Sequence, residues 1–93
     1  MILTLEIDKV APATYRAAAL NQGQAVCEAG TYASIAEAIR AEAAAVPDGF
    51  AYFIEPRYQG FSAGTVTLQK AQTDASELAD HLMQLGALAH DWH

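Results

Sequence analysis

Basic residues are scarce in this chain, and the few that are present are scattered. Five Lys and Arg stand against eleven Asp and Glu among 93 residues, which gives a formal net charge of −6 and a pI near 4.7. Nucleic-acid binding needs clustered Lys and Arg to neutralise phosphates, and anionic membrane surfaces attract the same clusters. We therefore expect neither nucleic acid nor a membrane as a partner. The acidic balance instead favours basic protein partners.

Cysteine and long apolar runs are also missing. Cys27 is the single cysteine, and its neighbours Val26 and Glu28 supply no positive charge to activate a thiolate. We interpret Cys27 as a small buried strand residue. The first residues lack the basic and apolar regions of a secretory signal, and no apolar run approaches the roughly 18 residues of a membrane-spanning helix. These absences predict a cytoplasmic protein.

Signatures of catalysis and of metal binding are absent. The sequence has no G-x-S-x-G, P-loop, G-x-G-x-x-G or C-x-x-C motif. Its three histidines are His81, His90 and His93, all within the last expected helix. Nine residues turn a helix by about 180° between His81 and His90, so the three cannot ligate one metal. We expect no metal and no cofactor, and the absences favour a non-catalytic protein.

Apolar alternation predicts a β-hairpin after a first strand. In residues 2–8, Leu3, Leu5 and Ile7 share one face, which is typical of a half-buried strand. Residues 14–20 and 24–29 flank Asn21-Gln22-Gly23, and a three-residue loop that ends in glycine suits a hairpin. Residues 50–58 and 65–70 are the fourth and fifth expected strands.

Two helices are expected from capping signals and apolar spacing. Ser34 and Glu37 form an S-x-x-E capping box, and Pro47-Asp48-Gly49 ends that helix. Its apolar stripe comprises Ile35, Ala38, Ile39, Ala43 and Val46, with Glu37 and Glu42 placed away from it. A second D-x-x-E start at Asp74 opens a seam of Ala75, Leu78, Leu82, Leu85, Ala89 and Trp92.

The element order β-β-β-α-β-β-α indicates an α+β fold. We predict one domain, residues 1–93, built as a two-layer sandwich in which two helices pack on one face of an antiparallel sheet. The helix at residues 34–42, following a strand pair, is similar to the S-x-x-E-A helix of small antitoxins of the HicB type. Such a resemblance implies a toxin-neutralising protein, but this sequence has no basic DNA-binding segment.

Five of the eight aromatic residues fall within twelve positions: Phe50, Tyr52, Phe53, Tyr58 and Phe61. Phe50, Tyr52 and Ile54 alternate on one strand face, and we assign them to the core, packed on the seam of the last helix. Pro56 predicts an edge strand or a bulge at that point. The candidate binding residues for a protein partner are Phe53, Arg57, Tyr58 and Phe61, on the other face and at the hairpin tip, because aromatics and arginine dominate interface hot spots.

Three functions are therefore open. The first is a protein-interaction module of the adaptor, regulator or toxin-neutralising type, which binds through the aromatic hairpin or an edge strand. The second is a small-molecule-binding protein or small enzyme, with a pocket between sheet and helices lined by Tyr15, Tyr52, Cys27 and His81. The third is self-association as a homo-oligomer through unpaired sheet edges.

Overall fold

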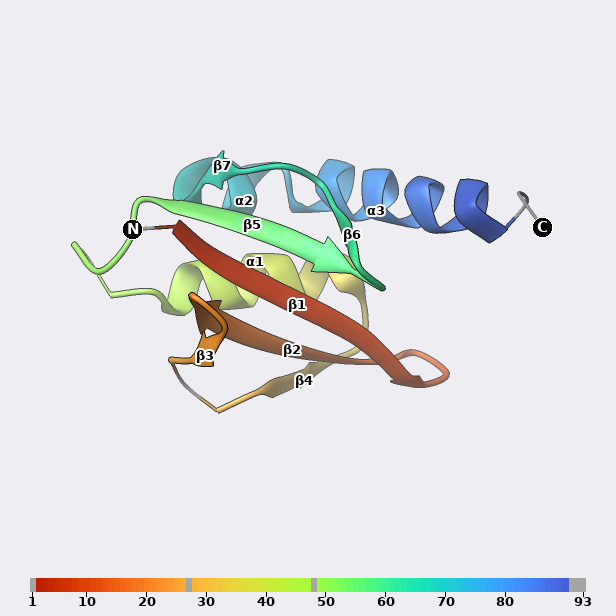
Figure 1. Ribbon diagram of the computed structural model, residues 1–93, viewed down its shortest axis with the longest axis horizontal. Helices are drawn as coiled ribbons and strands as arrows, with labels where there is room; N and C mark the ends of the chain where they lie inside the picture. Colours follow the sequence, from red (N-terminus) through yellow and green to blue (C-terminus); the bar gives the residue numbers. More distant parts are fainter. Residues whose placement is uncertain (1, 27, 48, 91–93) are drawn as a thin grey trace.

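A single mixed sheet, with helices on one side of it, makes up the fold (Figure 1). The computed structural model describes residues 2–26, 28–47 and 49–90, with the backbone alone for 86–90. The strands are β1 (Ile2–Ala11), β2 (Thr14–Asn21), β3 (Gln24–Ala25), β4 (Gly30–Tyr32), β5 (Phe53–Tyr58), β6 (Phe61–Ser62) and β7 (Val66–Thr67). The helices are α1 (Ile35–Ala45), α2 (Leu68–Thr73) and α3 (Ala75–His90). The predicted α+β sandwich is confirmed.

Strand direction departs from the prediction in the middle of the sheet. The order is β3-β2-β1-β5-β6, with β4 beside β2 and β7 beside β5. β1 and β5 run parallel, whereas every other pair is antiparallel. A crossover through α1 separates β1 from β5, and such a connection returns the chain in the same direction. The sheet is therefore mixed instead of wholly antiparallel.

Both hairpins with glutamine-glycine loops turn more tightly than predicted. Asn21 pairs with Gln24, so the loop holds two residues, Gln22 at φ 53° and Gly23 at φ 84°. Gln59 at φ 52° and Gly60 at φ 83° repeat this between β5 and β6. Two central residues with positive φ are typical of type I′ turns, whose twist matches that of the strands. The long loop expected at residues 59–64 is thus a two-residue turn followed by β6.

Helix α1 begins and ends where the sequence predicts. The Ser34 hydroxyl accepts a hydrogen bond from the Glu37 amide at 3.1 Å, which satisfies one free N–H of the first turn. After Val46 the chain turns, and the Phe50 amide donates to the Pro47 carbonyl at 3.1 Å. Gly49 supplies the positive φ of 79° that this turn requires.

The fifth predicted strand, residues 65–70, is largely helix. Only Val66–Thr67 pairs with β5, and α2 follows at once. Thr67 causes the change of structure, because its hydroxyl accepts from the Lys70 amide at 3.1 Å and caps the new helix. This third helix was missed, since a T-x-x-K sequence lacks the acidic residue of a capping box.

The core lies between the sheet and the helices and contains many alanines. Leu3, Leu5 and Ile7 are at most 1% exposed, as predicted from their alternation. Helices α1 and α3 contribute further buried side chains: Ile35, Ala38, Ile39, Ala43, Ala75, Leu78, Ala79 and Leu82. Small alanines let the helices approach the sheet closely, while the leucines and isoleucines bury most of the apolar area.

The prediction that Phe50 and Tyr52 are core residues is wrong. Strand β5 begins only at Phe53, so the alternation of the strand does not extend back to them. Phe50 is 40% exposed and Tyr52 67% exposed, whereas the intervening Ala51 is 4% exposed. Ile54 does lie in the core, next to the α3 seam as expected. The aromatic cluster is consequently more exposed than the sequence suggested.

Candidate functional site

The four candidate binding residues lie on two different faces of the sheet. Phe53 and Arg57 face away from the helices, beside Ile2 and Glu6 of β1. Tyr58 is 8% exposed and belongs to the core cluster, and Phe61 pairs with it on the same side. Placing Tyr58 with Phe53 was wrong, because residues five apart in a strand point to opposite faces.

The outer face of the sheet carries no helix among the described residues (Figure 1). We call this surface the open face and define it by the outward residues of three strands: Ile2, Thr4, Glu6, Asp8, Arg16, Ala18, Leu20, Phe53, Glu55 and Arg57. Ile2 and Phe53 are cross-strand partners, 52% and 42% exposed. The paired side chains form an apolar spot at the end of the sheet where β1 and β5 begin.

The remainder of the open face is mixed: Thr4, Ala18 and Leu20 are uncharged, and the other side chains are charged. Glu6 and Asp8 are exposed on β1, and Asp8 lies opposite Arg16 of β2. Within the part of the chain that the structure describes, no ion pair joins any of these groups. Glu6 and Asp8 therefore present two carboxylates to solvent. Because strands rise about 3.3 Å per residue, Glu6 lies about 13 Å from Ile2 along β1.

Arg57 is only weakly held in place. Its Nη2 donates to the Gly60 carbonyl at 3.4 Å, and its Nε is enclosed without a hydrogen-bond partner in the described structure. Next to it, Ser62 Oγ donates to Glu55 Oε2 at 2.7 Å. Glu55 is thus engaged within the hairpin, while the guanidinium has hydrogen-bonding capacity left.

Tyr58 packs against Tyr15 on the other face of β5, and its hydroxyl accepts a hydrogen bond from Gln59 Nε2 at 3.3 Å. Its ring lies 6.1 Å from the Tyr15 ring, with an interplanar angle of 58°. Burial raises the pKa of the Tyr58 hydroxyl above its usual 10.0, and the nearby Tyr15 and Asp8 charges raise it further. Within the core this hydroxyl stays protonated at neutral pH, as a structural group.

Short strands cover the two long edges of the sheet. Outside β2 lie β3 and β4, and outside β5 lie β6 and β7, none longer than three residues. Pro56 explains the break between β6 and β7. Its carbonyl accepts from the Ala63 amide at 3.0 Å, so its missing N–H also faces this outer side. The predicted bulge or edge at Pro56 thus corresponds to an interrupted outer strand.

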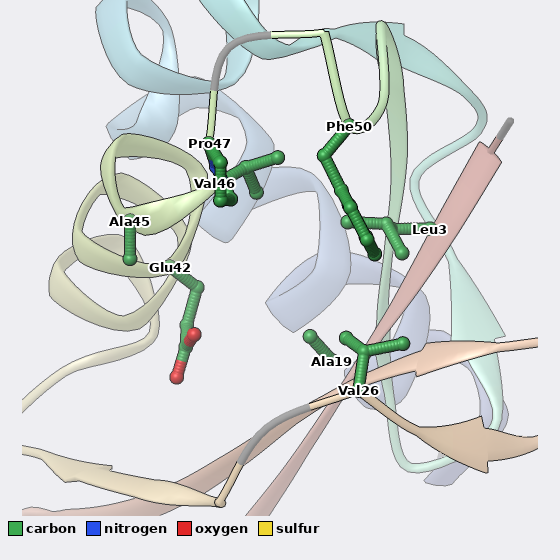
Figure 2. A pocket seen from close by; sticks show the side chains of 8 residues that line it. All are labelled: Leu3, Ala19, Val26, Glu42, Ala45, Val46, Pro47 and Phe50. Atoms are coloured by element: carbon green, nitrogen blue, oxygen red, sulfur yellow. The ribbon is translucent and has the colours of Figure 1, made fainter.

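A cavity of about 230 Å³ lies on the helix side of the sheet, beside the end of α1 (Figure 2). Its lining comprises Leu3, Ala19, Val26, Glu42, Ala45, Val46, Pro47 and Phe50. Leu3 and Ala19 form an apolar floor, and half-exposed Val26 and Phe50 stand at the rim. Among the described residues that line it, Glu42 alone is charged. Figure 2 shows it extending from α1 on the side opposite Phe50.

Glu42 is a functional candidate that the sequence reasoning missed. It was placed away from the apolar stripe, but it is only 7% exposed. The Tyr32 hydroxyl donates to its Oε1 at 2.9 Å. A signal was present, since residues 35, 38, 39 and 42 follow the i, i+3, i+4, i+7 spacing of one helix face.

The pocket residues expected from sequence do not come together. Tyr52 and His81 are exposed, and Cys27 lies outside the described residues. Tyr15 lines a second cavity of about 380 Å³ between α1 and α3. Among the described residues no group of His, Cys, Asp and Glu is arranged to hold a metal. His93 and the side chain of His90 fall outside that description.

Comparisons with protein families, with curated proteins and with solved structures return no match for this chain. None of the helices in the described part of the chain has the length and apolar character to span a membrane. The candidate sites of this chain are therefore the open face and the cavity.

Proposed function

We propose that this protein is a non-catalytic interaction module of the cytoplasm, and that it binds a basic, partly apolar segment of another protein on its open face. The observation that supports this most directly is the exposed pair of Ile2 and Phe53, which lies in register beside the carboxylates of β1. Exposed apolar spots rimmed by polar groups are typical of protein-binding surfaces. Phe53 supplies the aromatic anchor.

The charge of the chain supports a basic partner. Glu6 and Asp8 are exposed and unpaired among the described residues, and the whole chain carries a net charge of −6. A basic segment is therefore attracted over a long range and then paired locally. Such a segment would place an apolar side chain on Phe53 and a Lys or Arg about 13 Å away, next to Glu6.

Arg57 contributes a second polar contact. Its guanidinium lies between the apolar spot and the β6 turn, held by one long hydrogen bond to the Gly60 carbonyl. Arginine forms several directed hydrogen bonds from one planar group. A backbone carbonyl or carboxylate of the partner would accept from its free N–H groups. Tyr58 and Phe61 have no direct part in this proposal, because they lie on the helix side.

The open face is preferred over the sheet edges as the site of contact. Self-association through edges needs a long row of unpaired backbone groups, and β3, β4, β6 and β7 already pair with the outer sides of β2 and β5. A second copy of this chain would also bring the same unpaired carboxylates of β1 to the contact.

A peptide-display selection against the immobilised full-length chain tests the proposal. We expect enriched peptides to combine Leu, Ile or an aromatic residue with Lys or Arg. Phe53→Ser should weaken binding of the consensus peptide by at least about tenfold, as removal of an anchor does. The double change of Glu6→Gln and Asp8→Asn should weaken it several-fold and reduce its dependence on salt.

Matched controls lie away from the open face. Met83→Ser removes a similarly exposed apolar side chain from α3, and Glu28→Gln removes an exposed carboxylate from a loop. Both should bind the consensus peptide as the unaltered chain does. Absence of a basic-apolar consensus, or full binding by a folded Phe53→Ser variant, would refute the proposal. A dimer in light scattering that Phe53→Ser dissociates would assign the open face to a second copy instead.

A further inference from the structure

We infer that the cavity beside α1 is a separate binding site for a small primary amine with a compact apolar body. The site goes beyond the proposed protein interaction, because the cavity lies on the helix side of the sheet. Its features are an apolar floor, an exposed rim and the largely buried side chain of Glu42. Each of these restricts the chemistry of the ligand.

The size of the cavity limits the ligand to about one ring and a short chain. Apolar cavities of about 150 Å³ hold a benzene-sized molecule, and ordinary ligand pockets begin at about 300 Å³. A volume of about 230 Å³ lies between these values. Leu3 and Ala19 on the floor, with Val26 and Phe50 at the rim, would contact the faces and edges of a ring.

Glu42 sets the charge of the ligand. A carboxylate that lies among apolar side chains loses part of its hydration, and hydrogen bonds or an opposite charge replace what is lost. In the described structure, its one hydrogen bond comes from the Tyr32 hydroxyl to Oε1, and no cation lies within 4.0 Å of it. An ammonium group from a ligand would provide both the opposite charge and further N–H donors.

The surrounding chain keeps this carboxylate in place. Glu42 lies on the face of α1 that also carries buried Ile39 and Ala38, so the helix cannot rotate it outward without exposing them. At the opposite side, the Val26 amide donates to the Ala19 carbonyl at 3.0 Å. The turn that ends at Phe50 is closed by its bond to Pro47. Backbone hydrogen bonds thus hold Val26 and Phe50, the two residues at the rim of the cavity.

Titration with phenethylamine, followed by amide chemical shifts of the full chain, tests the inference. We expect a Kd on the order of 1 mM for so small a ligand, with shifts concentrated at Val26, Val46 and Phe50. The neutral analogue 2-phenylethanol should bind at least about tenfold more weakly, because it lacks the charge-assisted hydrogen bond. The anion 3-phenylpropanoate should produce no shifts there.

Variants of α1 provide a second measurement. Glu42→Gln keeps an acceptor for Tyr32 and should lower phenethylamine affinity about tenfold, whereas Glu37→Gln, on an exposed position of the same helix, should not. Ala45→Phe should fill the cavity and abolish binding, while Ala44→Phe places the same ring on the neighbouring exposed position, which does not line the cavity.

Two results would overturn the inference. The first is equal binding of phenethylamine and 2-phenylethanol, which is measured on the unaltered chain and so holds even if a variant does not fold. The second is a phenethylamine footprint on Ile2 and Phe53 in place of the cavity. Neither result bears on the open face as a peptide-binding surface, whose test uses different variants.

Discussion

The two faces of the sheet differ in what covers them, and β5 belongs to both. On the helix side, Ile54 and Tyr58 are buried among side chains of the core. On the open side, Phe53 and Arg57 alternate with them but remain partly exposed. Neighbouring residues of one strand thus have different roles, because successive side chains point to opposite faces of the sheet. Aromatic content alone therefore does not locate a binding surface.

Truncating adjacent residues of β5 is the strongest way to test this difference. Ile54→Ala should lower the free energy of unfolding by about 2–5 kcal/mol, because it leaves a void in a packed core. Phe53→Ala should lower it by no more than about 1 kcal/mol, since much of that ring is already in water. Urea denaturation followed by circular dichroism measures both. Equal losses would mean that the open face is covered.

Removing single tyrosine hydroxyls tests the same difference between buried and exposed positions for polar groups. Tyr32→Phe should cost about 1.5–3 kcal/mol, because the buried Glu42 carboxylate loses its hydrogen bond. Tyr52→Phe serves as the control and should change the unfolding free energy by less than about 0.5 kcal/mol, as its side chain is 67% exposed. Chemical denaturation at neutral pH measures the free energy of unfolding of both variants. An unchanged free energy of unfolding in Tyr32→Phe would show that groups other than the Tyr32 hydroxyl, or water, solvate the Glu42 carboxylate.

The smallest expected effect is a loss of stability at alkaline pH. The pKa of Tyr58 is raised in the folded state, chiefly by burial, so folding favours its protonated form. Its contribution is fully present below the unfolded pKa of about 10 and is lost as pH rises through the higher folded value. Urea midpoints should therefore fall above pH 10, and Tyr58→Phe should reduce that fall. An unchanged slope in the variant would contradict the assignment.

Local features of the sequence predicted several elements correctly. Alternation in β1 identified the three residues that face the helices, and Ser34 identified the start of α1. The candidate pair of Phe53 and Arg57 was correctly placed on the outer face of β5. The missed helix α2 shows the limit of such signals, because Thr67 could equally have continued a strand. Glu42 was wrongly placed away from the apolar stripe of α1, although its spacing from Ile35, Ala38 and Ile39 in the sequence puts it on the same helix face.

The sequence by itself therefore determined the elements whose periodicity and capping are local: β1, β2, α1 and the start of α3. The strand expected at residues 24–29 is shortened to Gln24–Ala25. Only the tertiary structure decided that β5 pairs parallel with β1, that Phe50 and Tyr52 stay outside the core, and that Tyr58 and Phe53 face opposite ways. The physical reason is that strand pairing and burial depend on contacts between residues far apart in the chain. Alternation within one strand reports two faces, but it does not say which of them the helices cover.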